Sequence, residues 1–313
     1  MTVHDLANTS SPVAVVPGET LSSLIRIDVA ALSHTGHHRA NNEDHYLVVR
    51  LGRSLETVST SLPRGDVPER TEEVNHVMIV ADGMGGHRAG EIASRMAITA
   101  LVNLALDIPD WIFRMDEAHA QEVERRSRSR IQEVDAMLVE SGQRDPSLAG
   151  MGTTLTAARS LGRDLLITHV GDSRAYLLRD GNLLRLTRDH TFVQLLVDTG
   201  KLAPTDAASS PHRHVLMNAV GGSSADVHVD TDRLQLENGD RLLLCSDGLT
   251  DLVDDESIAS ILVETTRSSD ACERLVKRAL DAGGRDNVTV IVAAYQIPSD
   301  TTRANDADTQ PGH

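Results

Sequence analysis

The chain has 313 residues, of which 40% are hydrophobic and only 2% aromatic, so its core must consist mainly of Leu, Val, Ile and Ala. The formal net charge is −16, from 46 acidic and 30 basic residues. This charge argues against broad electrostatic binding to nucleic acid or to an anionic membrane, and an anionic substrate would need local positive charge.

The expected environment follows from what the sequence does not contain. Its only cysteines, Cys245 and Cys272, are too few for a disulfide framework. No apolar run approaches the roughly 18 to 20 residues of a membrane span, and the first residues lack the pattern of a secretory signal. We therefore expect a cytoplasmic protein without a membrane or nucleic-acid partner.

Composition also divides the chain. Residues 1–23 mix Ser, Thr, Pro and Val without periodicity, and residues 298–313 are polar, so both ends are predicted to be flexible. No internal repeat or long linker interrupts the remainder. The sequence therefore predicts a single domain over residues 24–297.

Short apolar and β-branched runs predict the strands. They cover residues 25–33, 46–51, 76–81, 154–159, 165–170, 174–178, 183–186, 227–234, 241–246 and 288–295. Asp180-Gly181 separates two of these runs, and Asp-Gly is a preferred two-residue hairpin turn. An antiparallel hairpin is therefore expected there, whereas residues 52–73 are expected to form an extended loop.

Helical spacing occurs in blocks between the groups of strands. It covers residues 89–106, 117–140, 193–199, 256–265 and 270–282. Such grouping favours an α+β fold with helices covering antiparallel sheets. The polar stretch after the helix at 193–199 predicts a surface flap over about residues 190–216.

Acidic residues lie beside glycines at the ends of several predicted strands. Asp82 follows an apolar run and begins the segment Asp82-Gly83-Met84-Gly85-Gly86, whose glycines allow backbone carbonyls to approach a ligand. Asp172, Asp247 and Asp286 have similar positions. Each alone is explained by turn chemistry, but their recurrence favours a shared metal site, where cations would offset the like charges.

A further polar segment, residues 39–44, precedes the strand predicted at 46–51. Arg39 is suited to gripping a phosphate through two donors, and Glu43 and Asp44 add carboxylates. By itself this segment would be interpreted as a solvated loop with an ion pair. Its significance comes from its combination with the other acidic segments.

Taken together, these segments resemble the metal-dependent protein phosphatases, the PPM or type 2C family, and in particular its bacterial branch. The similarity extends from about residue 25 to about residue 297. It is carried, in order, by residues 39–44, 82–86, 151–155, 171–174, 245–249 and 284–289.

The resemblance implies a fold, a cofactor and a set of roles. The fold would be a β-sandwich of two mainly antiparallel sheets flanked by helix pairs, and the cofactor would be two Mn²⁺ or Mg²⁺ ions with a possible third. Asp82 would bridge the two ions, the Gly83 carbonyl would bind one, and Asp247 and Asp286 would bind the other. The remaining implied positions are Asp172, with Asp247, at a third ion, Glu43 and Asp44 at metal-bound waters, and Arg39 at the phosphate.

The implied reaction is hydrolysis of phosphoserine and phosphothreonine in proteins by activated water, without a covalent intermediate and in opposition to a serine/threonine kinase. Asp82 and Arg39 would be the catalytic residues. Some family members have His where this chain has Met84, and Met cannot donate a proton to the leaving oxygen. The bacterial branch also has Met there, so the general acid stays open.

Other interpretations have weaker support. The spacing of Cys272 and Arg278 fits a cysteine-dependent phosphatase, but the residues between them contain no glycine and continue a helical pattern. The basic run at residues 125–130 is expected to be a solvated helix face. An enzyme forming an aspartyl-phosphate would need a second aspartate two residues after Asp82, where Met84 stands. The main alternative from another class is a catalytically silent regulatory module of the same fold.

Overall fold

The computed structural model describes residues 21–85, 89–107, 117–207, 210–222 and 226–298. Most of the two predicted flexible ends lies outside these residues. The described part starts with the short helix α1 (Leu21–Leu24), where the Ser22 hydroxyl accepts a hydrogen bond from the Val74 backbone N–H at 3.2 Å.

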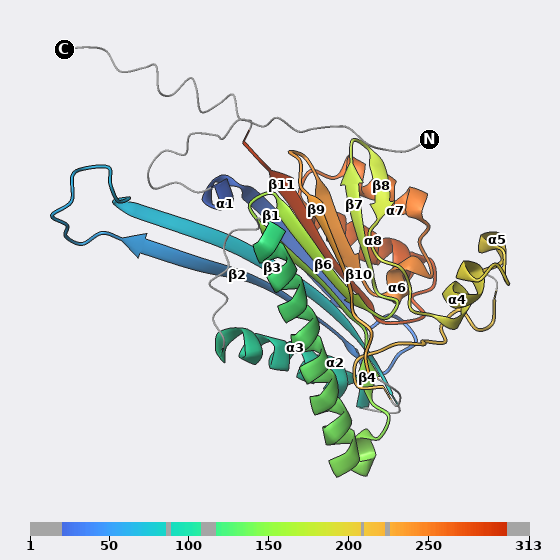
Figure 1. Cartoon of the computed structure of the whole chain (residues 1–313). Helices are drawn as coiled ribbons and strands as arrows, with labels where there is room; N and C mark the ends of the chain where they lie inside the picture. The colour runs from blue at the N-terminus through green and yellow to red at the C-terminus, as the bar shows by residue number, and fades with distance from the viewer. Residues whose placement is uncertain (1–20, 86–88, 108–116, 208–209, 223–225, 299–313) are drawn as a thin grey trace.

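Two antiparallel sheets form the centre of the structure (Figure 1). The first has the order β1 (Arg26–His34), β11 (Val288–Gln296), β10 (Arg241–Cys245), β7 (Arg174–Arg179) and β8 (Asn182–Arg185). The second has the order β2 (Asp44–Glu56), β3 (Arg70–Met84), β5 (Leu155–Leu161), β6 (Asp164–Val170) and β9 (Asp230–Gln235), and the short β4 (Gly152–Thr153) pairs with β3.

A pair of helices covers the outer face of each sheet. α2 (Ala89–Asp107) and α3 (Glu117–Arg144) pack on the second sheet, and α7 (Asp255–Glu264) and α8 (Ser268–Asp281) pack on the first. Shorter elements are η1 (Pro146–Leu148), α4 (Phe192–Asp198), α5 (Pro204–Ala207) and α6 (Asp247–Thr250). This layering of helices, sheet, sheet and helices confirms the predicted α+β sandwich.

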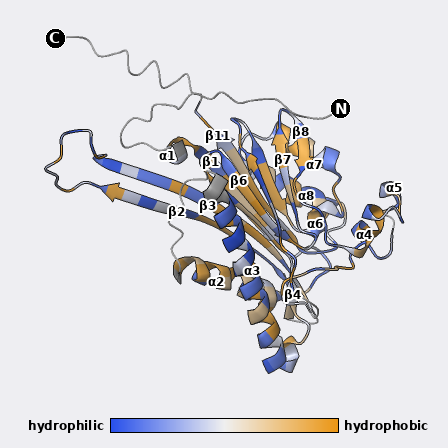
Figure 2. Ribbon diagram, in the orientation of Figure 1, coloured by the Kyte–Doolittle hydropathy of each residue, from blue (hydrophilic) through white to orange (hydrophobic). Residues whose placement is uncertain are grey.

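Three apolar clusters hold these layers together, one between the sheets and one beneath each helix pair. The central cluster contains Met78 and Ile167 of one sheet and Leu244 and Ile291 of the other. Figure 2 shows that the apolar residues concentrate on the strands and on the inner faces of the helices. The 2% aromatic content is thus compensated by aliphatic packing on both faces of each sheet.

The helix α2 contains a stretch, Ala89–Leu106, that is apolar and long enough to cross a membrane by length and composition, and it is the one such helix among the described residues. A helix was predicted at residues 89–106, but Glu91 and Arg95 interrupt its apolar residues, so no unbroken apolar run stands out in the sequence. In the fold, Ala93 and Ala97 are buried in the cluster that α2 shares with the second sheet and α3. This position is that of a core helix.

The predicted loop at residues 52–73 was wrong at both ends. β2 continues to Glu56 and β3 begins at Arg70, so the two strands form a long arm that extends beyond the sandwich (Figure 1). Arg53 pairs with Glu73 across the arm at 2.5 Å. Charged cross-strand pairs replace apolar alternation there, which is why the pattern of hydrophobic residues missed the strands.

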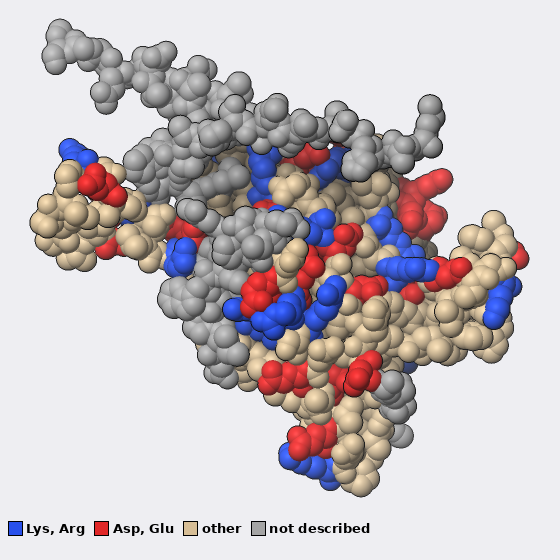
Figure 3. Space-filling model, viewed as in Figure 1, with Lys and Arg blue, Asp and Glu red and all other residues tan. Residues whose placement is uncertain are grey.

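Two further predictions were confirmed. β7 and β8 are joined at Asp180 and Gly181, whose φ angles of 50° and 78° suit the expected tight hairpin turn. The basic run lies on the surface of α3, where Arg125 and Arg126 both bind Glu122 at 2.7 Å. Figure 3 shows acidic and basic side chains interspersed along this helix.

Candidate active site

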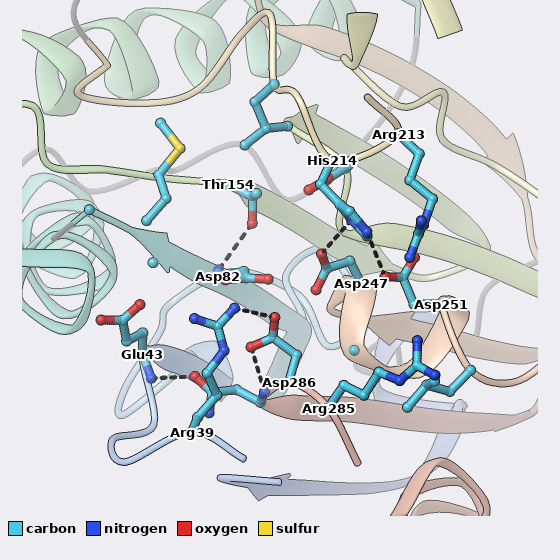
Figure 4. A pocket seen from close by; sticks show the side chains of 18 residues that line it. Arg39, Glu43, Asp82, Thr154, Arg213, His214, Asp247, Asp251, Arg285 and Asp286 are labelled. Carbon is cyan, nitrogen blue, oxygen red and sulfur yellow. Dashed lines mark hydrogen bonds and ion pairs between the residues drawn. The ribbon is translucent and has the colours of Figure 1, made fainter. Parts of the chain in front are cut away.

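A cavity of about 650 Å³ opens where strand ends of both sheets meet (Figure 4). Nearly all of the predicted site residues line it, although they come from distant parts of the sequence. They are Arg39, Glu43, Asp82, Gly83, Asp172, Asp247 and Asp286. The remaining predicted residue, Asp44, is buried and stands opposite Asp82 in the pairing of β2 with β3.

Asp44 joins the two sheets. Its Oδ2 accepts a hydrogen bond from the Ser246 hydroxyl at 2.7 Å, and the Ser246 oxygen accepts one from the Thr289 backbone N–H at 2.9 Å. The Oδ1 atom of Asp44 is buried and has no hydrogen-bond partner among the described residues. A buried carboxylate oxygen without a donor is suited to a cation or to an ordered water.

Close backbone contacts fix Asp82 and Gly83. The Asp82 N–H donates to the Thr154 hydroxyl at 3.0 Å, and the Gly83 N–H donates to the Glu43 carbonyl at 3.1 Å. A Cβ atom on Gly83 would lie 2.1 Å from the Gly90 carbonyl oxygen of α2. Only glycine permits this approach, which holds the strand end against the helix.

Asn287 organises the opposite wall, and the sequence analysis gave it no role. Its Oδ1 accepts from the Glu43 backbone N–H at 2.8 Å, and its Nδ2 donates to the carbonyls of Thr35 and Asn41 at 2.8 and 3.0 Å. It thereby fixes the loop that carries Arg39 against the start of β11. The sequence signals were its position directly after Asp286 and its place in the segment 284–289 that carries the family resemblance.

Arg39 reaches into the cavity and binds Asp286, with 2.6 Å between Nη2 and Oδ2. Its side chain is 54% exposed, so the guanidinium also faces the open space of the cavity. The structure therefore places the side chain predicted to bind phosphate and a predicted metal ligand in direct contact.

The electrostatics of the cavity are unfavourable for anionic carboxylates. Burial, followed by the neighbouring carboxylates, raises the pKa of Asp82 and of Asp247 well above the ordinary value of 3.8. Burial likewise raises the pKa of Asp44 to about 6 and that of Asp172 to about 7. Carboxylates crowded in this way repel one another when they are ionised, and bound cations would offset that repulsion, so the donor set fits divalent metal ions.

The segment predicted as a flap lies over one side of the cavity. At its two ends, Thr191 forms a β-bridge with Leu216, and the Phe192 N–H donates to the Val215 carbonyl at 2.8 Å. It brings Arg213 and His214 to the cavity, and Asp251 and Arg285 also contribute to the lining. Arg213, His214 and Asp251 lie outside the segments that carry the family resemblance, and Arg285 lies within the segment 284–289 but was given no role from the sequence.

A cavity lined by buried carboxylates and an arginine, at the edge of a two-sheet sandwich, has the chemistry of a cation-dependent phosphate site. Residues 58–282 match the family described as protein phosphatase 2C. The chain belongs to this family.

Individual relatives agree with the family assignment. The serine/threonine protein phosphatase PstP of Mycobacterium tuberculosis is 40% identical over 266 residues, which are 84% of this chain and 44% of PstP. The serine/threonine phosphatase stp of Listeria welshimeri is 39% identical over 221 residues, which are 71% of this chain and 85% of stp. This chain thus spans less than half the length of PstP.

The structural comparison gives the same result. The crystal structure of the PstP catalytic domain in complex with two manganese ions superposes with a TM-score of 0.66 at 35% identity. The match covers 87% of this chain and 99% of that one.

Proposed function

We propose that this chain hydrolyses phosphoserine and phosphothreonine in proteins, with Mn²⁺ or Mg²⁺ as its cofactor. The observation that carries the proposal is the burial of Asp82 and Asp247, both with strongly raised pKa values, in one cavity with Arg39. The manganese ions in the related PstP catalytic domain support the choice of cofactor.

The roles of the site residues are part of this proposal. Asp82, the Gly83 carbonyl, Asp247 and Asp286 would hold two cations, and Asp172 with Asp247 would hold a third. Glu43 and Asp44 would act through ordered water, for which the unpartnered Oδ1 of Asp44 offers an acceptor. Divalent cations held in this way lower the pKa of water and stabilise charge on phosphate oxygens.

The protein's own groups complete the chemistry. Arg39 would bind two phosphate oxygens through its planar fork of donors, of which only Nη2 contacts Asp286. The remaining carboxylate oxygen of Asp286 would be available as a cation ligand. Met84 lines the cavity and cannot protonate the leaving oxygen, so we expect a water molecule to supply that proton.

The biological setting is inferred from the same chemistry. The single phosphatase domain would comprise residues 24–297, with a flap over about residues 190–216, and would oppose a serine/threonine kinase. A cytoplasmic site of action is consistent with Cys245 and Cys272, which are buried and free. Burial raises the pKa of both thiols to about 12, so neither resembles a reactive cysteine.

The proposal is tested by phosphate release from a phosphothreonine peptide with Mn²⁺, with EDTA, and with the Asp247→Asn variant. We expect release with Mn²⁺ and its loss in both other cases, because Asp247 supplies charge that the cations need. The matched control is Glu133→Gln, which removes an exposed carboxylate from α3 and should leave the rate unchanged.

The alternative is a silent regulatory module that keeps the fold without the reaction. Its signature would be a missing ligand aspartate, whereas Asp82, Asp247 and Asp286 are all present in the cavity. Cation binding without phosphate release from several phosphopeptides would favour the silent module over the enzyme.

A further inference from the structure

His190 stands where the flap begins, outside the segments that carry the family resemblance, and its side chain is only 11% exposed. Its imidazole Nδ1 lies 3.2 Å from the Gly171 backbone nitrogen and 2.7 Å from Asn218 Nδ2. Its Nε2 lies 3.0 Å from Asp230 Oδ2. Both ring nitrogens of this side chain are therefore engaged in hydrogen bonds.

The partners of Nδ1 determine where the imidazole carries its proton. The Gly171 N–H can only donate, so Nδ1 must accept. The backbone of His228 orients the Asn218 amide, whose Nδ2 donates to the His228 carbonyl at 2.7 Å and whose Oδ1 accepts from the His228 N–H at 3.1 Å. The same Nδ2 donates to His190. The imidazole is thus neutral, and its Nε2–H donates to Asp230.

His190 and Gly171 form a reciprocal pair of hydrogen bonds. The His190 N–H donates to the Gly171 carbonyl at 2.7 Å, while the Gly171 N–H donates to the His190 ring. Gly171 has a φ of 108° and immediately precedes Asp172. Two bonds to one residue fix the turn that carries Asp172, which lines the active-site cavity.

The Gly171 turn also supports Asp82. A Cβ on Gly171 would lie 2.6 Å from the Thr154 Cβ, so the turn packs directly on Thr154. The Thr154 hydroxyl accepts from the Asp82 N–H and lies 2.8 Å from the Ser173 hydroxyl. A displacement of the turn would therefore reach two of the proposed cation ligands, Asp172 and Asp82.

The same histidine joins both ends of the flap. The Met217 N–H donates to the His190 carbonyl at 2.8 Å, and the Asn218 amide donates to its ring. Asp230 ties this base to β9, the edge strand of the second sheet. Figure 1 shows the flap helices α4 and α5 to one side of the two sheets, so contacts at the base contribute to the position of the flap.

We propose that His190 is a positioning residue, whose neutral imidazole sets the Asp172 turn and the base of the flap against each other. This inference rests on the proposed function, because the turn and the flap affect phosphate release only if the cavity is the active site. The competing explanation is that His190 contributes only to the stability of the fold. The two explanations differ over which ring atom matters.

Two substitutions separate the ring atoms. In His190→Asn, the side-chain Oδ1 can replace Nδ1 as the acceptor for Gly171 and Asn218, while the bond to Asp230 is lost. In His190→Gln, the longer amide can still reach Asp230, while the acceptor at the Nδ1 position is lost. We expect His190→Gln to lower kcat on a phosphothreonine peptide by about 10- to 100-fold, and His190→Asn by less than about threefold.

Thermal stability provides the comparison for these rates. Each variant loses one side of the network, so a purely structural role predicts similar losses of thermal midpoint and of kcat in both. The matched control is His228→Gln, because His228 contacts the other oxygen of Asp230 at 2.9 Å and its side chain is 76% exposed. This control should leave kcat and the thermal midpoint unchanged.

A second measurement requires neither metal nor substrate. Trypsin can cut the flap after Lys201 and Arg213, and these cleavages are followed by mass spectrometry in EDTA. We expect the flap of His190→Gln to be cut about tenfold faster than that of the unaltered chain, because its base is loosened. His190→Asn and His228→Gln should stay within about twofold of the unaltered chain.

NMR of the histidine side chains keeps the inference testable even where His190→Gln does not fold. The His190 signals are assigned by their absence from His190→Asn. In EDTA we expect a proton on Nε2 and none on Nδ1. A proton on Nδ1 would overturn the inference, because the ring could not then accept from Gly171.

The remaining outcomes separate this inference from the proposed function. Equal losses of kcat in His190→Asn and His190→Gln, or no loss in either, would overturn the positioning role. If the unaltered chain releases no phosphate from any peptide, the proposed function fails, and the flap cleavage rates alone then decide whether His190 sets the base of the flap.

Discussion

Asp172 determines part of the response of the metal-free chain to pH. Burial raises its folded-state pKa from 3.8 to about 7, so the folded chain retains a proton that the unfolded chain releases. Its contribution to the free energy of unfolding is therefore present below about pH 4 and is lost as the pH rises towards 7. Above that value the folded chain contains an uncompensated carboxylate when no cation is bound.

The variant Asp172→Asn tests this sign. Without metal at pH 7.5 it should be more stable than the unaltered chain, on the order of 2 to 4 kcal/mol, because the amide carries no charge. At pH 4 the two proteins should have nearly the same free energy of unfolding, measured by urea denaturation in EDTA. An advantage of equal size at both pH values would mean that titration of Asp172 is not its cause.

Gly248 shows how closely α6 approaches the start of β11. A Cβ at this position would lie 2.0 Å from the Asn287 carbonyl oxygen, so Gly248→Ala must push α6 away from the start of β11. We expect a loss of roughly 1 to 3 kcal/mol in the free energy of unfolding, together with weaker Mn²⁺ binding.

A glycine with ordinary surroundings provides the comparison for Gly248. Gly52 has its nearest such contact at 3.8 Å, so Gly52→Ala should change stability by less than about 1 kcal/mol and leave Mn²⁺ binding intact. Equal effects of the two substitutions in urea denaturation and Mn²⁺ titration would contradict the packing argument.

Among the elements, the outer part of the β2–β3 arm extends beyond the sandwich. β5 pairs only with the section of β3 from Asn75 to Val80, so the outer part of the arm has no neighbouring strand on that side. Leu55 is 50% exposed and Val58 is 93% exposed. The arm therefore adds little to the packed core.

Shortening the arm tests its independence from the candidate active site. Replacing residues 54–72 with Asn-Gly would join Arg53 to Glu73 through a two-residue turn and keep their ion pair. We expect unchanged phosphate release from a phosphothreonine peptide and a thermal midpoint within about 4 °C of the original. Loss of peptide activity in a folded variant would show that the arm does contribute to catalysis.

Sequence reasoning predicted the elements whose hydrophobic pattern is strong and missed those held by other forces. β10 and β11 are apolar runs whose side chains are buried in the central cluster and in the cluster beneath α7 and α8. Their positions were predicted to within about two residues. The outer arm depends on charged cross-strand pairs, and α6 is a single turn set by the contact of Gly248 with Asn287. Neither feature has the periodicity on which such predictions rest.

The candidate site shows the same division at the scale of the whole molecule. Motifs identified the residues that face one another in the cavity, because Asp82, Asp172 and Asp247 each lie at a strand end next to a glycine and the others belong to segments of the family resemblance. They did not reveal the hydrogen bond from Ser246 to Asp44, the ties made by Asn287, or the approach of His214 to Asp251. These contacts join segments far apart in the chain, so only the packing of the two sheets defines them.

The hydrogen bond between Asp44 and Ser246 has a consequence for the lifetime of the protein. It connects a strand of one sheet to the end of a strand of the other, in the same region where the proposed cation ligands converge from both sheets. Cations bound there would clamp the two halves of the sandwich together, so their removal should let the halves separate sooner. A cell starved of manganese would then lose the protein to proteolysis as well as its activity, so that metal supply would set how much of it persists.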